Sequence, residues 1–303
     1  MFFSGKTYRI SKKFCNFLSI QPATYNTQMG TKQAHEVFNK FYTKPEVSKF
    51  CVETFTSNIQ VQKEDLIIEP SAGGGVFIKP LKNITCYKIF IDIAPENEQV
   101  KQYDFLAWKP TNTIGKIHVI GNPPFGKQSS LCLKFIKHAA KFADSISFIL
   151  PLSFKKQHLL SKIPKNFHML HETIIEKNAF TYNGVNFKLP TVFQIWKKEN
   201  VERIEPEKEE PKGFTFVKQA KANIAITRVG SQTGIIKLNH QVSIIGLSKS
   251  THWFIKADEH LFKLLSTIQQ LKCESVEWVI GPKSLSKTEL TSLLNKIQKS
   301  DVS

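Results

Sequence analysis

Short apolar runs alternate with amphipathic stretches over the first two thirds of the chain. The apolar runs predict strands at 65–69, 87–92, 117–121, 146–150 and 190–196. Residues 128–143 repeat apolar side chains at helical spacing, which predicts a helix. Residues 33–57 predict a helix, a turn and a second helix, with Pro45 at a first helical position. Because strands alternate with helices, we expect an α/β fold, a mostly parallel sheet with helices on both faces.

The pattern changes near residue 200. Residues 200–212 are charged and contain prolines, which predicts a linker. Residues 214–255 alternate apolar and polar positions with glycines between them, which favours antiparallel strands. A capping box of Ser286 and Glu289 opens the second of two predicted helices, 258–271 and 286–299. We therefore expect a basic tail at 1–35, an α/β domain at 36–199, the linker at 200–212, and a small accessory α+β domain at 213–303.

Composition adds a partner to this picture. Basic residues outnumber acidic ones by 42 to 25, so the formal net charge is +17 and a polyanion such as nucleic acid is the expected partner. Apolar residues make up 41% of the chain, which is enough to build a core. The five cysteines form no Cys-x-x-Cys pair, and no apolar run is long enough to cross a bilayer. We therefore expect no disulfide framework, no metal site and no membrane span.

The first 35 residues bear on location. Residues 1–35 contain basic side chains and no acid, a composition that mitochondrial presequences share. Arg9 is the single arginine there and Pro22 interrupts any long helix, so a disordered basic tail is the other interpretation. Together with the cysteine usage, this predicts an intracellular protein, cytoplasmic or nuclear in the first place and mitochondrial in the second.

A glycine-rich turn follows the first predicted strand, with the sequence Glu69-Pro70-Ser71-Ala72-Gly73-Gly74-Gly75. Glycines let the backbone approach a ligand closely, and an acid at a strand end can hold an ammonium or a hydroxyl. Asp92 ends the next strand, where its carboxylate can accept both hydroxyls of a ribose. Farther along, Asp104 can accept from an exocyclic amine while Phe105 packs on the face of the ring.

The tetrapeptide Asn122-Pro123-Pro124-Phe125 directly follows the third predicted strand. Two prolines fix the backbone and remove two N–H donors, which leaves a rigid turn of carbonyl acceptors. Asn122 adds a side-chain acceptor and Phe125 a flat surface for stacking. Two acceptors aimed at the hydrogens of a planar amino group favour its pyramidalisation as the nitrogen attacks. The turn therefore indicates chemistry at an amino group conjugated to a ring.

In this order, the motifs resemble class I S-adenosylmethionine-dependent methyltransferases of the N6-adenine type, over about residues 38–196. The resemblance implies a Rossmann-like sheet in a catalytic domain, S-adenosylmethionine as cofactor, and a catalytic turn of Asn122, Pro123, Pro124 and Phe125. It implies transfer of a methyl group to the N6 amine of adenine in RNA or DNA, with no metal required. The cofactor-binding residues that it implies are Tyr42, Thr43, Pro45, Glu69, Pro70, Ser71, Ala72, Gly73, Gly75, Asp92, Ile93, Asp104, Phe105 and Asn122.

The nucleic acid is expected to contact Phe125, Lys127, Lys155, Lys156 and Arg228. Other functions stay open. Methylation of a glutamine amide at N5 in a protein uses a similar turn, but Phe125 and the charge of +17 count against it. Cytosine-N4 methylation is disfavoured by Asn122, since that class more often has serine there. An inactive methyltransferase fold that binds RNA is the non-enzymatic alternative.

Overall fold

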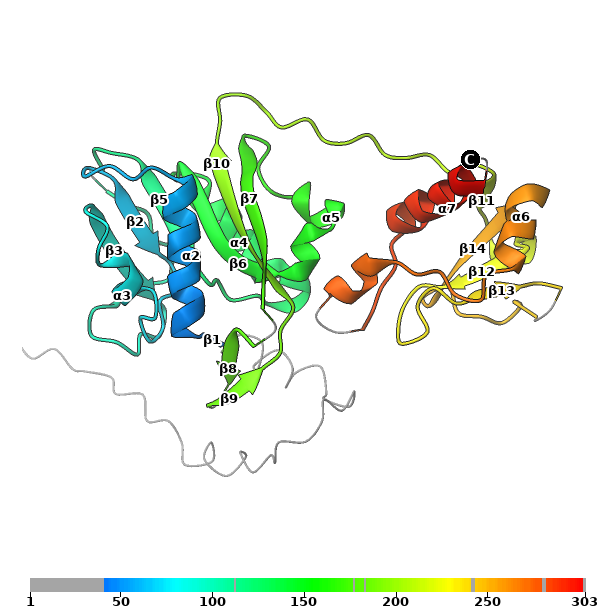
Figure 1. Cartoon of the computed structure of the whole chain (residues 1–303), viewed down its shortest axis with the longest axis horizontal. Coiled ribbons are helices and arrows are strands. Elements are labelled where there is room, and N and C mark those ends of the chain that lie inside the picture. The colour runs from blue at the N-terminus through cyan, green and yellow to red at the C-terminus, as the bar shows by residue number, and fades with distance from the viewer. Residues whose placement is uncertain are drawn as a thin grey trace, which may run out of the picture.

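The computed structural model describes residues 41–111, 113–176, 178–182, 184–240, 243–279 and 282–301. The tail at 1–35 and the first helix predicted within 33–57 lie outside these residues. Two clusters of buried apolar side chains organise the described chain into an N-terminal unit, up to residue 198, and a C-terminal unit from residue 214 (Figure 1). Residues 199–213 between them contain no helix or strand.

A seven-stranded sheet forms the centre of the N-terminal unit, in the order β4-β3-β2-β5-β6-β10-β7. All neighbouring strands are parallel except β10, which is antiparallel to both β6 and β7. Without β10, this is the strand order of doubly wound Rossmann folds. The strands are β2 (Leu66–Glu69), β3 (Tyr87–Asp92), β4 (Lys101–Gln102), β5 (Ile117–Gly121), β6 (Ser145–Pro151), β7 (Phe167–Ile175) and β10 (Thr191–Lys198).

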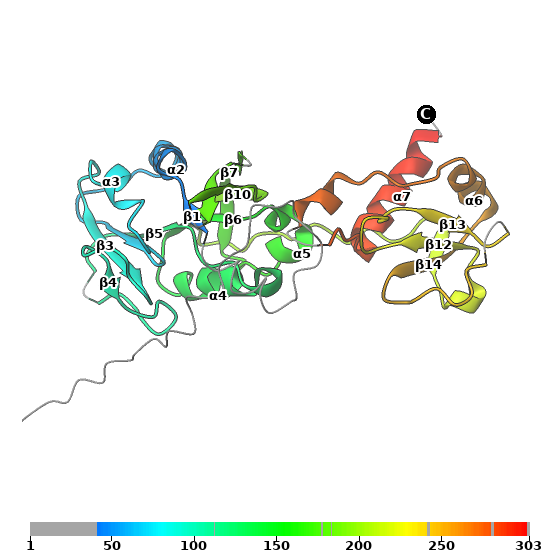
Figure 2. The ribbon, with the colours of Figure 1, turned by 90° about the horizontal axis from the view of Figure 1, so that it is seen from below.

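Helices cover both faces of this sheet, as the alternating pattern predicts (Figure 2). Helices α2 (Pro45–Asn58) and α3 (Ile78–Leu81) lie on one face, and α4 (Ser130–Ala139) lies on the other. Helix α4 buries Cys132, Phe135, Ile136 and Ala139, which recur at helical spacing. The helix begins two residues later than 128 because Gln128 and Ser129 have positive φ angles of 51° and 61°.

Several short elements of the N-terminal unit were not predicted. A three-stranded sheet joins β1 (Tyr42–Thr43), β8 (Phe180–Tyr182) and β9 (Val185–Phe187). The edge strand β7 was missed because only its two end residues are buried, so its sequence carries no apolar run. The other unpredicted elements are α3, β4, α5 (Gln157–Leu160) and the 3₁₀ turns η2 (Lys127–Ser129) and η3 (Leu152–Lys155).

The C-terminal unit has a four-stranded antiparallel sheet, as predicted. The capping box is confirmed, because the Ser286 N–H donates to Glu289 at 2.8 Å and the Glu289 N–H donates to Ser286 Oγ at 3.2 Å. Helix α6 ends at Ser266, earlier than the predicted residue 271. The elements are β11 (Phe214–Phe216), η4 (Gln219–Lys221), β12 (Ile224–Thr227), β13 (Ile236–Leu238), β14 (His252–Ala257), α6 (Glu259–Ser266), η5 (Glu274–Trp278) and α7 (Lys287–Asp301).

Two structural absences concern the described residues alone. None of their helices combines the length and apolar character that a bilayer crossing requires. Their His, Cys, Asp and Glu side chains form no group of three or more that could hold a metal ion.

Candidate active site

Three polar side chains meet at the carboxyl edge of the large sheet. Glu69 ends β2, Asp92 ends β3 and Asn122 follows β5, and these strands are adjacent in the sheet. Ligands of open α/β sheets bind outside the carboxyl ends of the strands, where the order of the strands reverses. The order reverses between β2 and β5: β3 and β4 follow β2 on one side of it, and the chain then crosses to β5 on its other side.

Asn122 is held in one orientation by two neighbouring segments. Its side-chain Nδ2 donates to Thr43 Oγ1 at 3.1 Å, and its main-chain oxygen accepts from Ser71 Oγ at 3.0 Å. Thr43 lies in β1 and is buried. Because Nδ2 is engaged, the amide presents Oδ1 as a fixed acceptor, and this atom is buried without a hydrogen-bond partner. An orphaned buried acceptor is costly unless a ligand satisfies it.

The glycine-rich turn is tied to Asp92. The Gly73 N–H donates to Asp92 Oδ2 at 2.8 Å, and the Ala94 N–H donates to Asp92 Oδ1 at 2.8 Å. Gly75 has a φ of 79°, a backbone conformation that strains any residue with a Cβ, so the close turn favours glycine. A carboxylate has room for more than two donors. Asp92 can therefore still accept hydroxyl groups while the turn holds it in place.

Glu69 is buried, and no cation among the described residues forms an ion pair with it. The side chain is 1% exposed and its Oε2 has no hydrogen-bond partner. Burial, together with the negative charge of Asp92, raises the pKa of Glu69 well above its ordinary value. The Glu69 Cγ packs 3.2 Å from the position that a Cβ of Gly121 would take, directly before Asn122. The arrangement suits a ligand with a positive charge, which would stabilise the ionised carboxylate.

The outer wall of the site carries Tyr42 and Ile93. The Tyr42 hydroxyl donates to Glu96 Oε1 at 2.7 Å, and this hydrogen bond raises the pKa of Tyr42 to about 12. Ile93 follows Asp92 and is 68% exposed, which leaves an apolar surface beside the acid for a planar ring. Pro45 is the first residue of α2, as its predicted helical position requires.

Two predicted ring contacts differ from the structure. Phe125 is 4% exposed and packs in the core, so its ring stacks on a base only if the turn moves. Phe105 is 2% exposed, with its ring centroid 5.1 Å from that of Phe135 and 4.9 Å from that of His138 on α4. The ring of Phe105 is therefore a core contact and not a surface for adenine. Asp104 beside it is exposed and accepts from the Leu106 N–H at 2.9 Å.

Lys155 and Lys156, which we expected to hold a phosphate backbone, both form ion pairs within the protein. Lys156 is buried, and its Nζ lies 3.0 Å from Glu289 of the C-terminal unit. Lys155 pairs with Glu172 at 2.7 Å and lies over the ring of Trp278. Both lysines thus hold elements of the fold together. Their pairing is not visible in the sequence because it joins residues that are far apart in the chain.

Arg228 also has a packing role. Its guanidinium lies 3.9 Å from the ring centroid of Trp253, and its Nε is buried without a hydrogen-bond partner. The Trp253 Nε1 donates to the Leu285 carbonyl at 2.8 Å. This hydrogen bond fixes the segment before α7 to the sheet, and the expected contact of Arg228 with nucleic acid stays a prediction. Lys127, by contrast, is exposed beside the Asn122 turn.

Two residues at the rim of the site could not be found from the sequence. Asn97 Nδ2 donates to the Gly74 carbonyl at 3.2 Å and so braces the glycine turn. Ser129 has a left-handed backbone and lies with its Oγ 3.4 Å from Ser153 Oγ, just after the Asn122 turn. Strained residues of this kind cluster at functional sites. A positive φ at a non-glycine residue leaves no signal in the composition.

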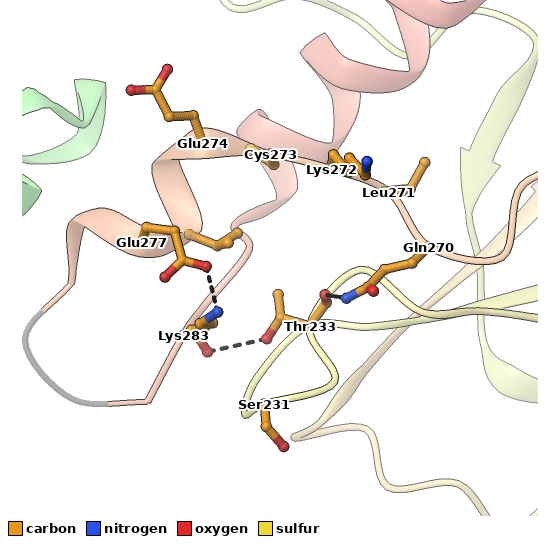
Figure 3. A pocket seen from close by; sticks show the side chains of 10 residues that line it. Ser231, Thr233, Gln270, Leu271, Lys272, Cys273, Glu274, Glu277 and Lys283 are labelled. Atoms are coloured by element: carbon orange, nitrogen blue, oxygen red, sulfur yellow. Dashed lines mark hydrogen bonds and ion pairs between the residues drawn. The ribbon is translucent and has the colours of Figure 1, made fainter. Parts of the chain in front are cut away.

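A separate hollow of about 390 Å³ lies in the C-terminal unit (Figure 3). Its polar groups bond to one another. Thr233 Oγ1 donates to the Lys283 carbonyl at 3.3 Å, Gln270 Nε2 donates to the Thr233 carbonyl at 2.8 Å, and Lys283 pairs with Glu277. The hollow shares no residue with the cluster around Asn122, and its lining offers no orphaned acceptor like Asn122 Oδ1.

No family model matches the chain, and the search of curated proteins finds no match. Solved structures similar to it include a candidate RNA methyltransferase from Pyrococcus horikoshii, at 16% identity over 54% of this chain and 89% of that chain, with a TM-score of 0.41. A candidate class I S-adenosylmethionine-dependent methyltransferase from Listeria monocytogenes is 14% identical over 57% of this chain and 65% of that chain, with a TM-score of 0.42. TrmN from Thermus thermophilus is 14% identical over 51% of this chain and 49% of that chain, with a TM-score of 0.36.

Proposed function

We propose that this protein transfers a methyl group from S-adenosylmethionine to the N6 amine of adenine in nucleic acid. The observation that carries the proposal is the amide of Asn122, fixed through Nδ2 by Thr43 so that Oδ1 is a buried acceptor without a partner. The turn lies at the switch point of the sheet, beside acidic groups that suit the donors of the cofactor.

The residues present fit S-adenosylmethionine. Its hydroxyl groups are donors that Asp92 can accept, and its ammonium is a cation that would favour the ionised form of Glu69. Ile93 offers an exposed apolar surface for its adenine ring. Gly73 and Gly75 have no side chains, so the ligand can approach the backbone of the turn closely. When bound, the cofactor supplies an electrophilic methyl group on sulfur, and no metal is required.

The turn would act by positioning the amine of the substrate. Asn122 Oδ1 and the Pro123 carbonyl accept the two amino hydrogens, which directs the nitrogen lone pair towards the methyl group. Preorganised dipoles of this kind cost no reorganisation during the reaction. The proton passes from the methylated nitrogen to solvent water after the new N–C bond has formed, so attack needs no strong base. The adenine enters from a single strand or is flipped out of a duplex.

The chemistry of the substrate follows from charge. The chain carries a net charge of +17, which favours a polyanion over a protein amide as substrate. Lys127 is exposed directly after the turn, where it can meet a phosphate next to the target base. The same turn could hold the amide of a glutamine, and this alternative is an outcome of the experiments below.

The proposal is tested with purified protein, labelled methyl donor and an unstructured adenine-containing RNA or DNA. We expect Asn122→Ala to lower the rate of transfer by about a hundredfold or more, as loss of a preorganised group does. Its affinity for S-adenosylmethionine, measured by calorimetry, should stay close to that of the wild type. The matched control Asn83→Ala, at an exposed position, should keep full activity. Retained transfer by Asn122→Ala would contradict the catalytic assignment.

A further inference from the structure

One face of helix α4 is basic, and among the described residues its lysines form no ion pair. Lys134 and Lys137 are exposed on the helix, Lys127 is exposed before it and Lys141 after it. We refer to these four residues as the α4 lysine stripe. No aspartate or glutamate occurs between Asn122 and Ala143. The stripe is therefore an exposed, purely basic surface on the segment that follows the Asn122 turn.

The stripe is unpaired, unlike other lysines of the same unit. Within the described part of the chain, no carboxylate lies at ion-pair distance from any of its four lysines. On the opposite face of the sheet, Lys49 of α2 lies 3.7 Å from Glu53. Lys155 and Lys156 also have carboxylate partners. A row of unpaired cations is electrostatically unfavourable by itself and attracts a polyanion.

The helix is joined rigidly to the Asn122 turn. The Leu131 and Cys132 N–H groups both donate to the Phe125 carbonyl, at 3.3 and 3.5 Å, and Cys132 Sγ donates to the Pro124 carbonyl at 3.6 Å. The lysines therefore stand at fixed positions relative to the proposed catalytic turn. At about 1.5 Å per residue, the distance along the axis from Ser130 to Lys137 is about 10 Å. This matches roughly three nucleotides of a stacked strand, at about 3.4 Å each.

We propose that the α4 lysine stripe binds the phosphodiester backbone of single-stranded nucleic acid beside the target adenine. The inference rests on the proposed function for the identity of the target base, and it goes further by naming the surface that the strand follows. A single strand fits because an amine that reacts at the turn must be unpaired. The stripe makes the enzyme specific for a polymer, because a free nucleoside has no phosphates to meet it.

The test uses the triple variant Lys134→Gln, Lys137→Gln and Lys141→Gln in the full chain. The matched control is Lys63→Gln, Lys79→Gln and Lys82→Gln, three exposed lysines away from α4 that remove the same charge. Binding of labelled single-stranded RNA and DNA of about 12 nucleotides is measured by fluorescence anisotropy over a range of salt concentrations. Calorimetry with S-adenosylmethionine shows whether each variant is folded.

Each neutralised phosphate of a single strand contributes about 0.7 to the slope of log affinity against log salt. The α4 variant should therefore lose about 2 from the magnitude of that slope, and its affinity at low salt should fall at least about tenfold. The control should keep the wild-type slope. In methylation assays, the α4 variant should show a raised KM for an oligonucleotide and an unchanged kcat.

The outcomes separate this inference from the proposed function. An α4 variant with the wild-type slope, or a wild-type protein that binds neither strand, would overturn the stripe. If the wild type binds strands through the stripe but methylates no nucleic acid, the stripe stands and the proposed function fails. If the control loses as much of the slope as the α4 variant, binding follows the total charge and the stripe is again overturned.

Discussion

The amino ends and the carboxyl ends of the strands form two opposite edges of the large sheet, here called the amino edge and the carboxyl edge. These two edges differ in whether their buried polar groups have hydrogen-bond partners. At the amino edge, the carboxylate of Asp65 accepts from the main-chain N–H groups of Gln62 and Lys116, at 2.7 and 2.8 Å. Its Oδ2 lies 3.3 Å from His118 Nε2, and His118 Nδ1 lies 2.8 Å from Ser145 Oγ. At the carboxyl edge, Glu69 Oε2 and Asn122 Oδ1 have no partner.

Burial alone does not separate these clusters, since His118 is 2% exposed and Glu69 is 1% exposed. The difference is hydrogen-bond satisfaction. A satisfied buried network stabilises and orders the fold, whereas an unsatisfied one costs stability until a ligand binds. Functional sites are where proteins accept such local costs. We therefore assign stability to the amino edge and ligand binding to the carboxyl edge.

The largest effect is expected from breaking the amino edge. His118→Ala removes a buried ring and leaves Asp65 and Ser145 short of a partner, so the free energy of unfolding should fall by about 3 kcal/mol. Denaturant titration measures this. The control His171→Ala, on the edge strand β7, should cost less than about 1 kcal/mol. Equal losses in the two variants would show that the buried network has no special weight.

A smaller effect is expected from Glu69→Gln at the carboxyl edge. Loss of the carboxylate should weaken binding of S-adenosylmethionine about tenfold, because a charge-assisted hydrogen bond is replaced by a neutral one. The free energy of unfolding at pH 8 should not fall, because a glutamine stays neutral in the buried site at any pH. Calorimetry and denaturant titration give the two values, with the exposed Glu64→Gln as control. A destabilised variant with unchanged cofactor affinity would assign Glu69 to the fold instead.

The two edges should also differ in the sign of their pH dependence. Burial lowers the pKa of His118 despite Asp65 beside it, so the folded state binds fewer protons and stability is lost as the pH falls below 6.5. Burial raises the pKa of Glu69, so the folded state keeps its proton and stability is lost as the pH rises above 4.5.

Denaturant titrations from about pH 5 to pH 8 measure both contributions. Relative to the wild type, His118→Ala should flatten the decline on the acid side. Glu69→Gln should flatten the decline on the alkaline side. If both variants change the pH profile in the same direction, His118 and Glu69 do not contribute to stability with opposite pH dependence.

The smallest effect is expected at the rim of the site. Tyr42→Phe removes the hydrogen bond to Glu96, which joins β1 to the loop after β3. A net loss of about 1 kcal/mol should weaken cofactor binding about fivefold. Tyr87→Phe, at the exposed amino end of β3, is the matched control and should have no effect. Equal cofactor affinities for the two variants would remove Tyr42 from the site.

Apolar runs made the parallel strands predictable, because strands buried on both faces carry continuous hydrophobic sequences. Strands β3 and β5 have the predicted bounds, and the capping box of α7 is formed as expected. The edge strand β7 and the short β8 and β9 could not be predicted in this way, because they are only partly buried or very short.

The candidate site was predictable only in part. Motif spacing indicated that Glu69, Asp92 and Asn122 would share one sheet edge, since parallel strands place their carboxyl ends together. Spacing does not reveal long-range pairs. The partners of Lys156 and Arg228 lie in other elements, far along the chain, so no sequence pattern predicts these pairs. The ring of Phe105 was misassigned for the same reason, because its contacts come from α4.

Transfer of a methyl group to the N6 amine of adenine is tested most directly by identifying the methylated product. Wild-type protein with labelled S-adenosylmethionine is offered equal amounts of RNA, single-stranded DNA, duplex DNA and cellular protein, and the labelled species is identified by mass spectrometry. We expect N6-methyladenosine or its deoxy form, with single strands preferred over duplex DNA. Label in a protein glutamine, or no transfer to any substrate by a protein that binds the cofactor, would contradict it.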